Sequence, residues 1–466
     1  MLKITEHFEY YNRNRNHIST FQTVNEWNTY FEMAVAEDEI LFNDCPKSHC
    51  AHVQLQKTAD DKYCCNIKSS YYIGLDRFPK LGLDVYISPK INTINQRLDY
   101  IKILLEALSE PENFEHLGGL MQAKFDNNWI WINREEVPIL TPFLLAQFLT
   151  VVKSLVKKGL KKSYYTRTDN LRNRIKGKLL VGPQIKNNVL KNRLLDNFCQ
   201  FQEFGVDSEV NQFLKFVLSK VAHYMDLYGH NTDIYKNLKS HLDYCEGGFH
   251  HISDTQFRQF KYKEVNAFYK HYNIAIQLGN QILRLEDYNI AREANISHEV
   301  PHPPFWIDMS KLFELYVFKL LKEKYPGENE LRYHETFNRQ EPDFILNTRS
   351  GVQAIVDCKY KPRYATGNPN IEDARQLSGY TRLNKIYQYF ELDHNELIPA
   401  YIIYPANLDK LNITEVAPVD SFETQEQPES SAILNPPSCR ISTTYKMMYM
   451  EEVYLPTDNH PNPLQI

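Results

Sequence analysis

The sequence predicts an α+β protein of several domains, and three observations lead to that prediction. At 466 residues the chain is longer than one compact domain usually is. Its hydrophobic fraction of 42% supplies apolar side chains for more than one core. The hydrophobic pattern changes from mixed strands and helices, to helices, and back to a mixture. We therefore predict an N-terminal mixed β/α domain (1–160), a mainly helical central region (161–300) and a C-terminal α/β domain (301–466).

Residues 1–160 contain patterns of both strand and helix. Runs rich in β-branched and aromatic residues predict strands at Tyr71–Leu75, Leu83–Ser88 and Asn128–Arg134. Apolar residues at helical spacing predict helices at Gln96–Leu108 and Phe143–Leu155. We predict that this small sheet or barrel domain binds a partner protein.

The central region follows a strongly basic stretch. Residues 153–178 carry ten lysines and arginines and a single acidic residue, Asp169, which gives a local charge of +9 in a chain of formal net charge −5. Two interpretations stay open. The stretch is either a surface that meets phosphates or an acidic partner, or a solvated helix end and linker.

Helical spacing dominates the rest of the central region. Apolar residues follow the helical period from Phe213 to Met225 and from Phe268 to Ile282. Paired helices of this kind predict either an elongated stalk or an ordinary globular core. The proline-rich sequence HEVPHPPFW at 298–306 predicts a joint before the C-terminal domain.

The most informative motif of the chain lies in the C-terminal domain. Two hydrophobic runs, Phe344–Leu346 and Val352–Val356, flank a polar turn and predict a strand–turn–strand unit. Asp343 opens the first strand, Asp357 closes the second, and Lys359 lies two residues further on. Because side chains two apart on a strand share a face, Asp357 and Lys359 should point the same way.

This arrangement reads as PD-x13-D-x-K, a signature of nucleases that need a metal ion. Carboxylate oxygens bind hard cations such as Mg²⁺. The bound cation polarises a phosphate and lowers the pKa of a bound water, which a lysine can steady or deprotonate. The alternative interpretation is that the two aspartates cap turns and that the lysine lies on a solvated edge.

Helices are predicted on both sides of the motif, which is the order expected of a restriction-type nuclease core. Upstream, a wide apolar helical face surrounds Glu314, which is either surface or an auxiliary carboxylate of the site. Downstream, after a predicted N-cap at Asn370, Gln376 and Tyr380 lie four apart, as a DNA-facing pair or as an exposed glutamine and a core aromatic. Cys358 faces away from the motif side chains and is predicted to fill core space, with its backbone carbonyl as an additional metal ligand.

Three further segments complete the C-terminal domain. Ile402–Tyr404 and Thr443–Tyr454 predict strands. Pro418–Pro437 is polar and proline-rich, and predicts a mobile loop.

The sequence excludes several other classes. It contains no G-x-x-x-x-G-K-[ST] and no G-x-G-x-x-G, so nucleotide hydrolysis would have to come from a partner. The longest uncharged stretch, Val137–Val152, is too short and too polar to cross a bilayer, and the N-terminus has no signal-peptide pattern. Eight scattered cysteines fit a reducing cytoplasm better than a disulfide framework. The cluster within Cys45–Cys65 is interpreted as free thiols, with a zinc site as the alternative.

Several stretches resemble the McrC family, the nuclease subunits of McrBC-type restriction systems, which act on modified cytosine. The sharpest matches are WIDMSKLFELYV (Trp306–Val317), PDFIL (Pro342–Leu346), AIVDCKYK (Ala354–Lys361) and DARQLSGYT (Asp373–Thr381). Weaker matches lie at Tyr71–Ile91, Tyr165–Leu179 and Phe204–Leu218.

The resemblance implies a C-terminal PD-(D/E)xK, restriction-endonuclease-like domain that cuts double-stranded DNA with Mg²⁺. The implied metal ligands are Asp343, Asp357 and the carbonyl of Cys358, and the implied catalytic residues are Asp343, Asp357, Lys359, Glu314, Gln376 and Tyr380. It also implies a cytoplasmic anti-phage role.

The resemblance further implies a partner, an AAA+ ring that hydrolyses GTP or ATP and that the central region enters and stimulates. Arg172, Arg174, Lys176 and Asp207 lie in the matching central stretches and are the predicted partner contacts. Two other functions stay open. One is an autonomous DNA repair or recombination nuclease, and the other is a non-catalytic activator of an AAA+ ring.

Overall fold

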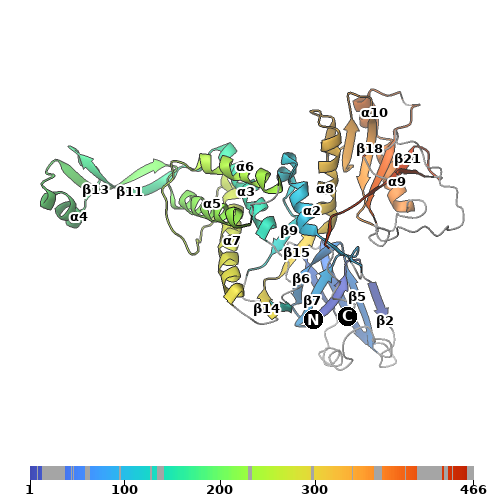
Figure 1. The fold of residues 1–466 in the computed structure, drawn as a ribbon, viewed down its shortest axis with the longest axis horizontal. Coiled ribbons are helices and arrows are strands. Elements are labelled where there is room, and N and C mark those ends of the chain that lie inside the picture. Colours follow the sequence, from blue (N-terminus) through green and yellow to red (C-terminus); the bar gives the residue numbers. More distant parts are fainter. Residues whose placement is uncertain are drawn as a thin grey trace. The chain divides into compact units, whose positions relative to one another are not determined.

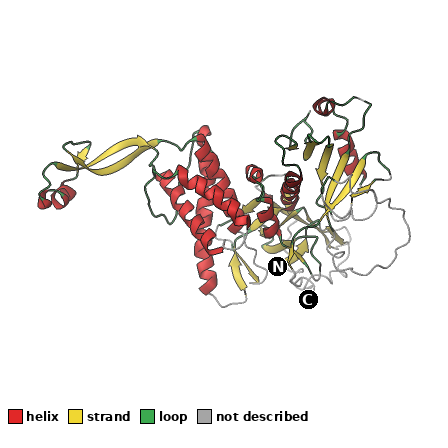
Figure 2. Cartoon of the chain, turned by 45° about the horizontal axis from the view of Figure 1, so that its top comes forward, coloured by secondary structure: helices red, strands yellow, loops and turns green. Residues whose placement is uncertain are grey.

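The chain is a mixed α/β protein whose described residues form two compact units (Figures 1 and 2). One unit consists of Met1–Ile139 and Ser297–Ile466, the other of Leu140–Ile296. The computed structural model describes the chain outside residues 8, 13–36, 43–44, 46, 58–62, 94–95, 126–128, 134–140, 229–232, 295–298, 338, 362–369, 394, 407–432, 435–438, 443 and 459–466. The division into three domains at residues 160 and 300 stays a prediction.

The first unit contains a five-stranded sheet that combines four strands from the first 123 residues with one strand that follows the second unit in the sequence. Its strands, in order, are β1 (Leu2–Thr5), β7 (Leu83–Ser88), β6 (Tyr72–Phe78), β15 (Phe305–Asp308) and β9 (Met121–Ala123). Trp306 is fully buried in this sheet, and its indole N–H donates to Asp76 Oδ2 at 2.9 Å. A side chain at Gly74 would collide with Phe305 and Trp306, so glycine allows β6 and β15 to pair here.

Residues 298–306 were predicted to be a joint, and that prediction is wrong for their described part. Glu299–His302 forms β14, which pairs with β10 (Ile130–Asn133), and β15 lies inside the five-stranded sheet. Within the described residues β14 pairs with β10 alone, so it is an edge strand, which is where a proline such as Pro301 is tolerated.

The same unit holds smaller elements beside this sheet. They are a four-stranded sheet of β2 (Glu9–Asn12), β5 (Tyr63–Ser69), β4 (His49–Lys57) and β3 (Glu37–Leu41), a strand pair of β8 (Arg97–Leu98) and β22 (Thr457–Asp458), the helix α2 (Tyr100–Ala107) and the 3₁₀ helix η3 (Pro111–His116).

A six-stranded sheet carries the motif residues. In order, its strands are β16 (Leu331–Tyr333), β17 (Phe344–Asn347), β18 (Gln353–Cys358), β19 (Ala400–Pro405), β21 (Met448–Val453) and β20 (Cys439–Ile441). The accompanying helices are α8 (Met309–Lys324), α9 (Ile371–Tyr380) and α10 (Asn384–Phe390), and both α8 and α9 contact β18.

The predicted strand–turn–strand unit is confirmed. β17 and β18 pair antiparallel across a turn in which Gly351 adopts a φ of +89° and the Thr348 N–H donates to the Val352 carbonyl. The helices predicted on either side are α8 and α9, and the later strands are β19 and β21. The predicted mobile loop lies outside the described residues, apart from Ile433 and Leu434.

The second unit has a core of four helices. They are α3 (Thr141–Lys158), α5 (Glu209–Tyr228), α6 (Asp233–Gly248) and α7 (His271–Ala294). α3 packs on α6 and α7, and α5 packs on the same two helices. These helices therefore form a globular core, not an elongated stalk of paired helices. In the described part of the chain, no helix combines the length and the apolarity needed to span a membrane.

The prediction of a mainly helical region is wrong for two segments of this unit. Ser163–Arg172 (β11) and Asp196–Gly205 (β13) pair over ten residues each, with β12 (Lys178–Leu179) beside β13. This ribbon leads away from the helices of its own unit to the short helices α4 (Val181–Asn187) and η5 (Val189–Lys191) (Figures 1 and 2). We call the segment 172–195 the ribbon tip.

Candidate active site

The pairing of β17 and β18 brings the two motif aspartates together. Phe344 pairs with Val356 in antiparallel register, so Asp343 and Asp357 come next to each other at the same end of the two strands. The backbone N–H of Cys358 donates to Asp343 Oδ2 at 2.6 Å. The Asp343 side chain is thus fixed by the strand that carries its partner carboxylate.

Lys359 lies against Asp357, as the strand alternation predicted. Its Nζ is 2.7 Å from Asp357 Oδ2, and the two side chains are 15% and 1% exposed. The same ammonium donates to Gln376 Oε1 at 3.1 Å, and Gln376 Nε2 donates to the Tyr380 hydroxyl at 2.7 Å. The side chain of Asn370 caps the N-terminus of α9, as predicted. This helix carries Gln376 and Tyr380 and places them near Lys359.

Burial makes the two carboxylates difficult to ionise. It raises the pKa of Asp343 well above its usual value, and the neighbouring Asp357 and Glu314 raise that pKa further. Burial also raises the pKa of Asp357, although Lys359 opposes this. For Lys359, burial alone would lower the pKa, but the attraction of Asp357 outweighs it and the pKa is raised. The lysine is therefore an ammonium at neutral pH.

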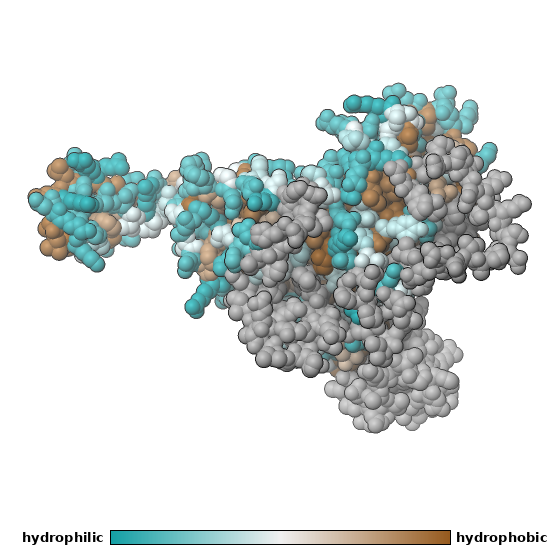
Figure 3. Space-filling model, viewed as in Figure 1, coloured by the Kyte–Doolittle hydropathy of each residue, from teal (hydrophilic) through white to brown (hydrophobic). Residues whose placement is uncertain are grey.

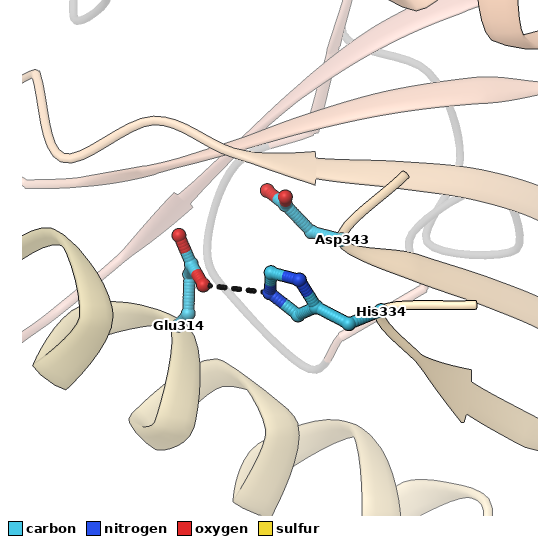
Figure 4. Close-up of side chains that lie close together, drawn as sticks. All are labelled: Glu314, His334 and Asp343. Atoms are coloured by element: carbon cyan, nitrogen blue, oxygen red, sulfur yellow. Dashed lines mark hydrogen bonds and ion pairs between the residues drawn. The ribbon is translucent and has the colours of Figure 1, made fainter. Parts of the chain in front are cut away.

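A third acidic side chain reaches the same place from α8. Glu314 Oε2 accepts hydrogen bonds from the Tyr333 hydroxyl at 3.2 Å and interacts with His334 Nε2 at 3.1 Å. Glu314, His334 and Asp343 each offer a ligand atom, and these atoms all lie within 4.8 Å of one another (Figure 4). Glu314 therefore points into the site, and is not on an outer helix surface.

The sequence analysis missed His334, and two other polar residues of the site. His334 follows the short strand β16 and has a φ of +53°, so no periodic pattern announces it. Lys361 and Asp373 form an ion pair at 2.9 Å that links the end of the motif to α9. The spacing of Lys361 two residues beyond Lys359 was a signal for its position on the same side.

Several of these side chains line one cleft of the first unit, with a volume of about 610 Å³, whereas Asp343, Asp357 and Tyr380 are not among its lining residues. Its lining residues are His7, Tyr71, His116, Asp308, Ser310, Lys311, Glu314, Tyr333, His334, Cys358, Lys359, Tyr360, Lys361, Asp373 and Gln376. The Cys358 residue is buried, which raises the pKa of its thiol and disfavours a nucleophilic thiolate. The oxygen-rich wall suits a hard divalent cation, and the lysines suit a phosphate.

Residues next to the N-terminal sheet contact the residue that follows the motif lysine. The Lys90 ammonium donates to the backbone carbonyl of Tyr360 at 2.5 Å and lies 4.2 Å from the centre of the Tyr360 ring. The Lys90 backbone N–H donates to Glu6 Oε1 at 3.0 Å. Tyr360 directly follows the motif lysine, so Glu6 and Lys90 connect the end of β1 to the site.

Replacing Glu6 with glutamine should reduce the loss of stability that occurs as the pH rises from 4.5 to about 7. Burial raises the pKa of Glu6 to about 7 from 4.5, so between these values the folded chain holds a proton that the unfolded chain releases. Stability therefore falls as pH rises through this window, by about 3 kcal/mol for this group. The melting temperature of the glutamine variant should drop less between pH 5 and pH 8 than that of the wild type. Glu328→Gln, at an exposed glutamate, is the matched control, and identical pH profiles for both variants would refute the assignment.

The predicted partner contacts fall into two groups that lie apart. Arg172, Arg174 and Lys176 are exposed at the ribbon tip. Asp207 lies beyond the other end of the ribbon, because Ser163 pairs with Gly205 while Arg172 pairs with Asp196, a separation of roughly 30 Å along the strands.

Asp207 has bonding partners of its own at the base of the ribbon. It accepts hydrogen bonds from the Ser253 N–H at 2.7 Å and the Ser253 hydroxyl at 2.6 Å. Partial burial would raise the pKa of Asp207, but these bonds lower it below its usual value. The structure therefore does not bring Asp207 together with the three basic residues. Instead, the Asp207 side chain holds the segment around Ser253 in its own unit.

The ribbon tip combines charge with exposed apolar side chains. Figure 3 shows hydrophobic side chains at the far end of the ribbon. They include Ile175, Val181, Ile185, Val189, Leu190, Leu194 and Leu195, of which Leu190 is 76% exposed. The basic residues within 172–178 lie at the end of β11, at the start of β12 and in the turn between these strands. This part of the basic stretch is therefore neither a helix end nor a linker.

The cysteine cluster gives no support to a zinc site in the described residues. Cys50 is buried and Cys45 is exposed, while His52 Nε2 interacts with Glu37 Oε1 at 2.6 Å. Neither Cys45 nor Cys50 forms a disulfide, and the side chains of Cys64 and Cys65 lie outside the described residues, so the choice between free thiols and a zinc site stays a prediction.

Comparisons with known proteins were made for the whole chain. Residues 67–392 match a family model described as McrBC 5-methylcytosine restriction system component. A search of curated proteins finds no match.

Two solved structures from Thermococcus gammatolerans are similar to this chain. One is a refined half-complex from a tetradecameric assembly of McrB AAA+ hexamers with bound McrC, with 15% identity over 97% of this chain and 94% of that chain and a TM-score of 0.36. The other is a cryo-EM structure of the McrBC complex, with 16% identity over 71% of this chain and 89% of that chain and a TM-score of 0.24.

Proposed function

This chain belongs to the family of McrBC 5-methylcytosine restriction system components, and on that premise we propose that it is the DNA-cleaving subunit of a McrBC-like restriction complex. The observation that carries the proposal is the convergence of Asp343, Asp357 and Lys359 at the end of the paired strands β17 and β18, where Lys359 lines the cleft. We assign the six-stranded sheet with α8 and α9 as a PD-(D/E)xK nuclease domain that acts on double-stranded DNA in the cytoplasm.

The donor groups of the site fit Mg²⁺. The carboxylates of Asp343 and Asp357 and the carbonyl of Cys358 would hold the ion, since all three offer hard oxygen ligands. Two buried carboxylates with raised pKa values also favour a cation that offsets their repulsion. When bound, the ion would polarise the scissile phosphate and lower the pKa of a water.

The remaining side chains position the reacting groups. The Lys359 ammonium lies between Asp357 and Gln376, where it can hold a phosphate oxygen or orient the attacking water. Gln376 accepts a hydrogen bond from the Lys359 ammonium and donates one to the Tyr380 hydroxyl. The two residues thus hold the ammonium in position. Because its pKa is raised, Lys359 acts in this proposal as a positioned cation and not as a base.

A separate surface serves the partner in this proposal. The ribbon tip would contact an AAA+ NTPase ring, with Arg172, Arg174 and Lys176 as charged contacts and the neighbouring apolar side chains as the desolvated part of the interface. The chain would thereby stimulate hydrolysis of GTP or ATP by the ring.

Removal of divalent cations should abolish DNA cleavage. The test incubates the chain and its partner NTPase with plasmid DNA, with and without modified cytosine, and follows nicking and linearisation on a gel. Excess EDTA should stop cleavage, and added Mg²⁺ should restore it. Cleavage that continues in EDTA would contradict the proposed metal-dependent mechanism.

A further inference from the structure

A second group of metal-ligand side chains lies at the cleft and shares Asp343 with the motif. Glu314 comes from α8, His334 follows β16, and Asp343 precedes β17, so three elements deliver them to one place (Figure 4). Their ligand atoms lie within 4.8 Å of one another. A common ion would need only small side-chain movements, because metal–ligand bonds of about 2 Å place ligand atoms roughly 3 Å apart.

His334 is held in the way that metal-binding histidines usually are. Its backbone N–H donates to the Asp343 carbonyl at 3.0 Å, and its Nδ1 lies 3.2 Å from Glu341 Oε1. A carboxylate on one ring nitrogen fixes the ring and leaves the other nitrogen for a metal. That other nitrogen, Nε2, points toward Glu314 inside the cleft. The Glu341 contact is an observation independent of the ligand cluster itself.

Two carboxylate oxygens of the group have no hydrogen bond in the described part of the chain. Glu314 takes its bonds from Tyr333 and His334 on Oε2, and Asp343 takes its bond from Cys358 on Oδ2. Glu314 Oε1 and Asp343 Oδ1 are therefore available as ligands. Together with His334 Nε2 they make a donor set of one nitrogen and two oxygens.

We propose that Glu314, His334 and Asp343 form a second metal position, which takes a first-row divalent transition-metal ion such as Mn²⁺ in preference to Mg²⁺. The inference rests on the proposed nuclease function only in that Asp343 would be shared with the Mg²⁺ position. An imidazole nitrogen favours transition-metal ions, whereas Mg²⁺ prefers oxygen ligands and keeps several waters. The residues would therefore set which metal the site accepts.

The bland alternative is a structural ion-pair chain in which a protonated His334 bridges Glu314 and Glu341. Hydrogen bonding to Glu314 raises the pKa of His334, which favours this protonated form when no metal is bound. The two interpretations differ in one measurable property. An ion-pair chain binds no metal, and its loss changes only stability.

The test counts Mn²⁺ ions bound per chain from the electron paramagnetic resonance signal of free Mn²⁺. Wild-type chain should bind two ions, and His334→Ala and Asp357→Asn should each bind one. Glu314→Gln should lower the affinity for the second ion by at least about 10-fold, since even residues that only orient a ligand commonly contribute this much to metal affinity. His250→Ala, at an exposed histidine of the other unit, is the matched control and should keep both ions.

The outcomes separate this inference from the proposed function. If His334→Ala and Glu314→Gln bind Mn²⁺ as the wild type does, the second position is refuted, while loss of one ion and of cleavage in Asp357→Asn would still support the nuclease proposal. If Asp357→Asn cleaves normally, the nuclease proposal fails whatever His334 binds. Melting curves in EDTA show whether each variant is folded. If His334→Ala does not fold, the Mn²⁺ affinity of Glu314→Gln still tests the second metal position.

Discussion

Asp357→Asn should lower the rate of DNA cleavage by at least about 1,000-fold, or roughly 4 kcal/mol of transition-state stabilisation. The substitution keeps the shape of the side chain and removes the charge that we propose binds the metal and that lies 2.7 Å from the Lys359 ammonium. Lys359→Met, which keeps the apolar stem and removes the ammonium, should have an effect of similar size. Both variants should be assayed as the assembled complex with its NTPase, in Mg²⁺.

Stability separates a catalytic role from a structural one at this position. Asp357 is 1% exposed, and burial raises its pKa, so the ionised carboxylate costs free energy in the metal-free fold. In EDTA, the melting temperature of Asp357→Asn should therefore equal or exceed that of the wild type. Asp84→Asn, which removes a surface ion pair with Arg77 in the same unit, is the control and should cleave normally. Normal cleavage by Asp357→Asn, or a large fall in its melting temperature, would overturn the assignment.

Reversing the charges at the ribbon tip should abolish stimulation of the partner NTPase. The triple variant Arg172→Glu, Arg174→Glu, Lys176→Glu changes three exposed side chains, so the fold of the second unit should be preserved. Like charges placed across an interface cost several kcal/mol, which predicts a loss of binding of at least about 100-fold. The measurements are the hydrolysis rate of the ring against the concentration of this chain, and the affinity of the pair.

A matched triple variant tests whether position matters or only charge. Lys239→Glu, Lys261→Glu, Lys263→Glu makes the same change in net charge at exposed residues of the same unit, away from the ribbon tip. It should stimulate hydrolysis almost as the wild type does. Equal loss in the two triple variants would show a general charge effect, and full stimulation by the tip variant would remove the ribbon tip as the partner contact.

The motif residues could be grouped from the sequence because local geometry places them. Asp343 and Asp357 flank a short hairpin, and antiparallel pairing puts such positions side by side. Lys359 follows from strand alternation, and Gln376 with Tyr380 from the helical period. The roles of these residues in cleavage stay predictions until the variants are measured.

Other parts of the site could not be obtained in this way. His334 sits at a positive φ after a three-residue strand, and no periodic pattern reaches it. Glu6 and Lys90 approach Tyr360 from more than 250 residues away in the sequence. The ribbon of β11 and β13 was missed because few of its side chains are buried, so it lacks the clear alternation that marks a half-buried strand.

The sequence by itself determined which motif side chains come together, because hairpin register and strand alternation act over a few residues and bring two aspartates and a lysine to one place. The helical period likewise brings Gln376 next to Tyr380. The tertiary structure alone decided which unpredicted distant groups join them: His334 beside Glu314 and Asp343, Lys90 on the Tyr360 carbonyl, and β15 inside the N-terminal sheet. The physical reason is that such contacts depend on how separate elements pack, and packing is set by the burial of whole faces and not by local spacing.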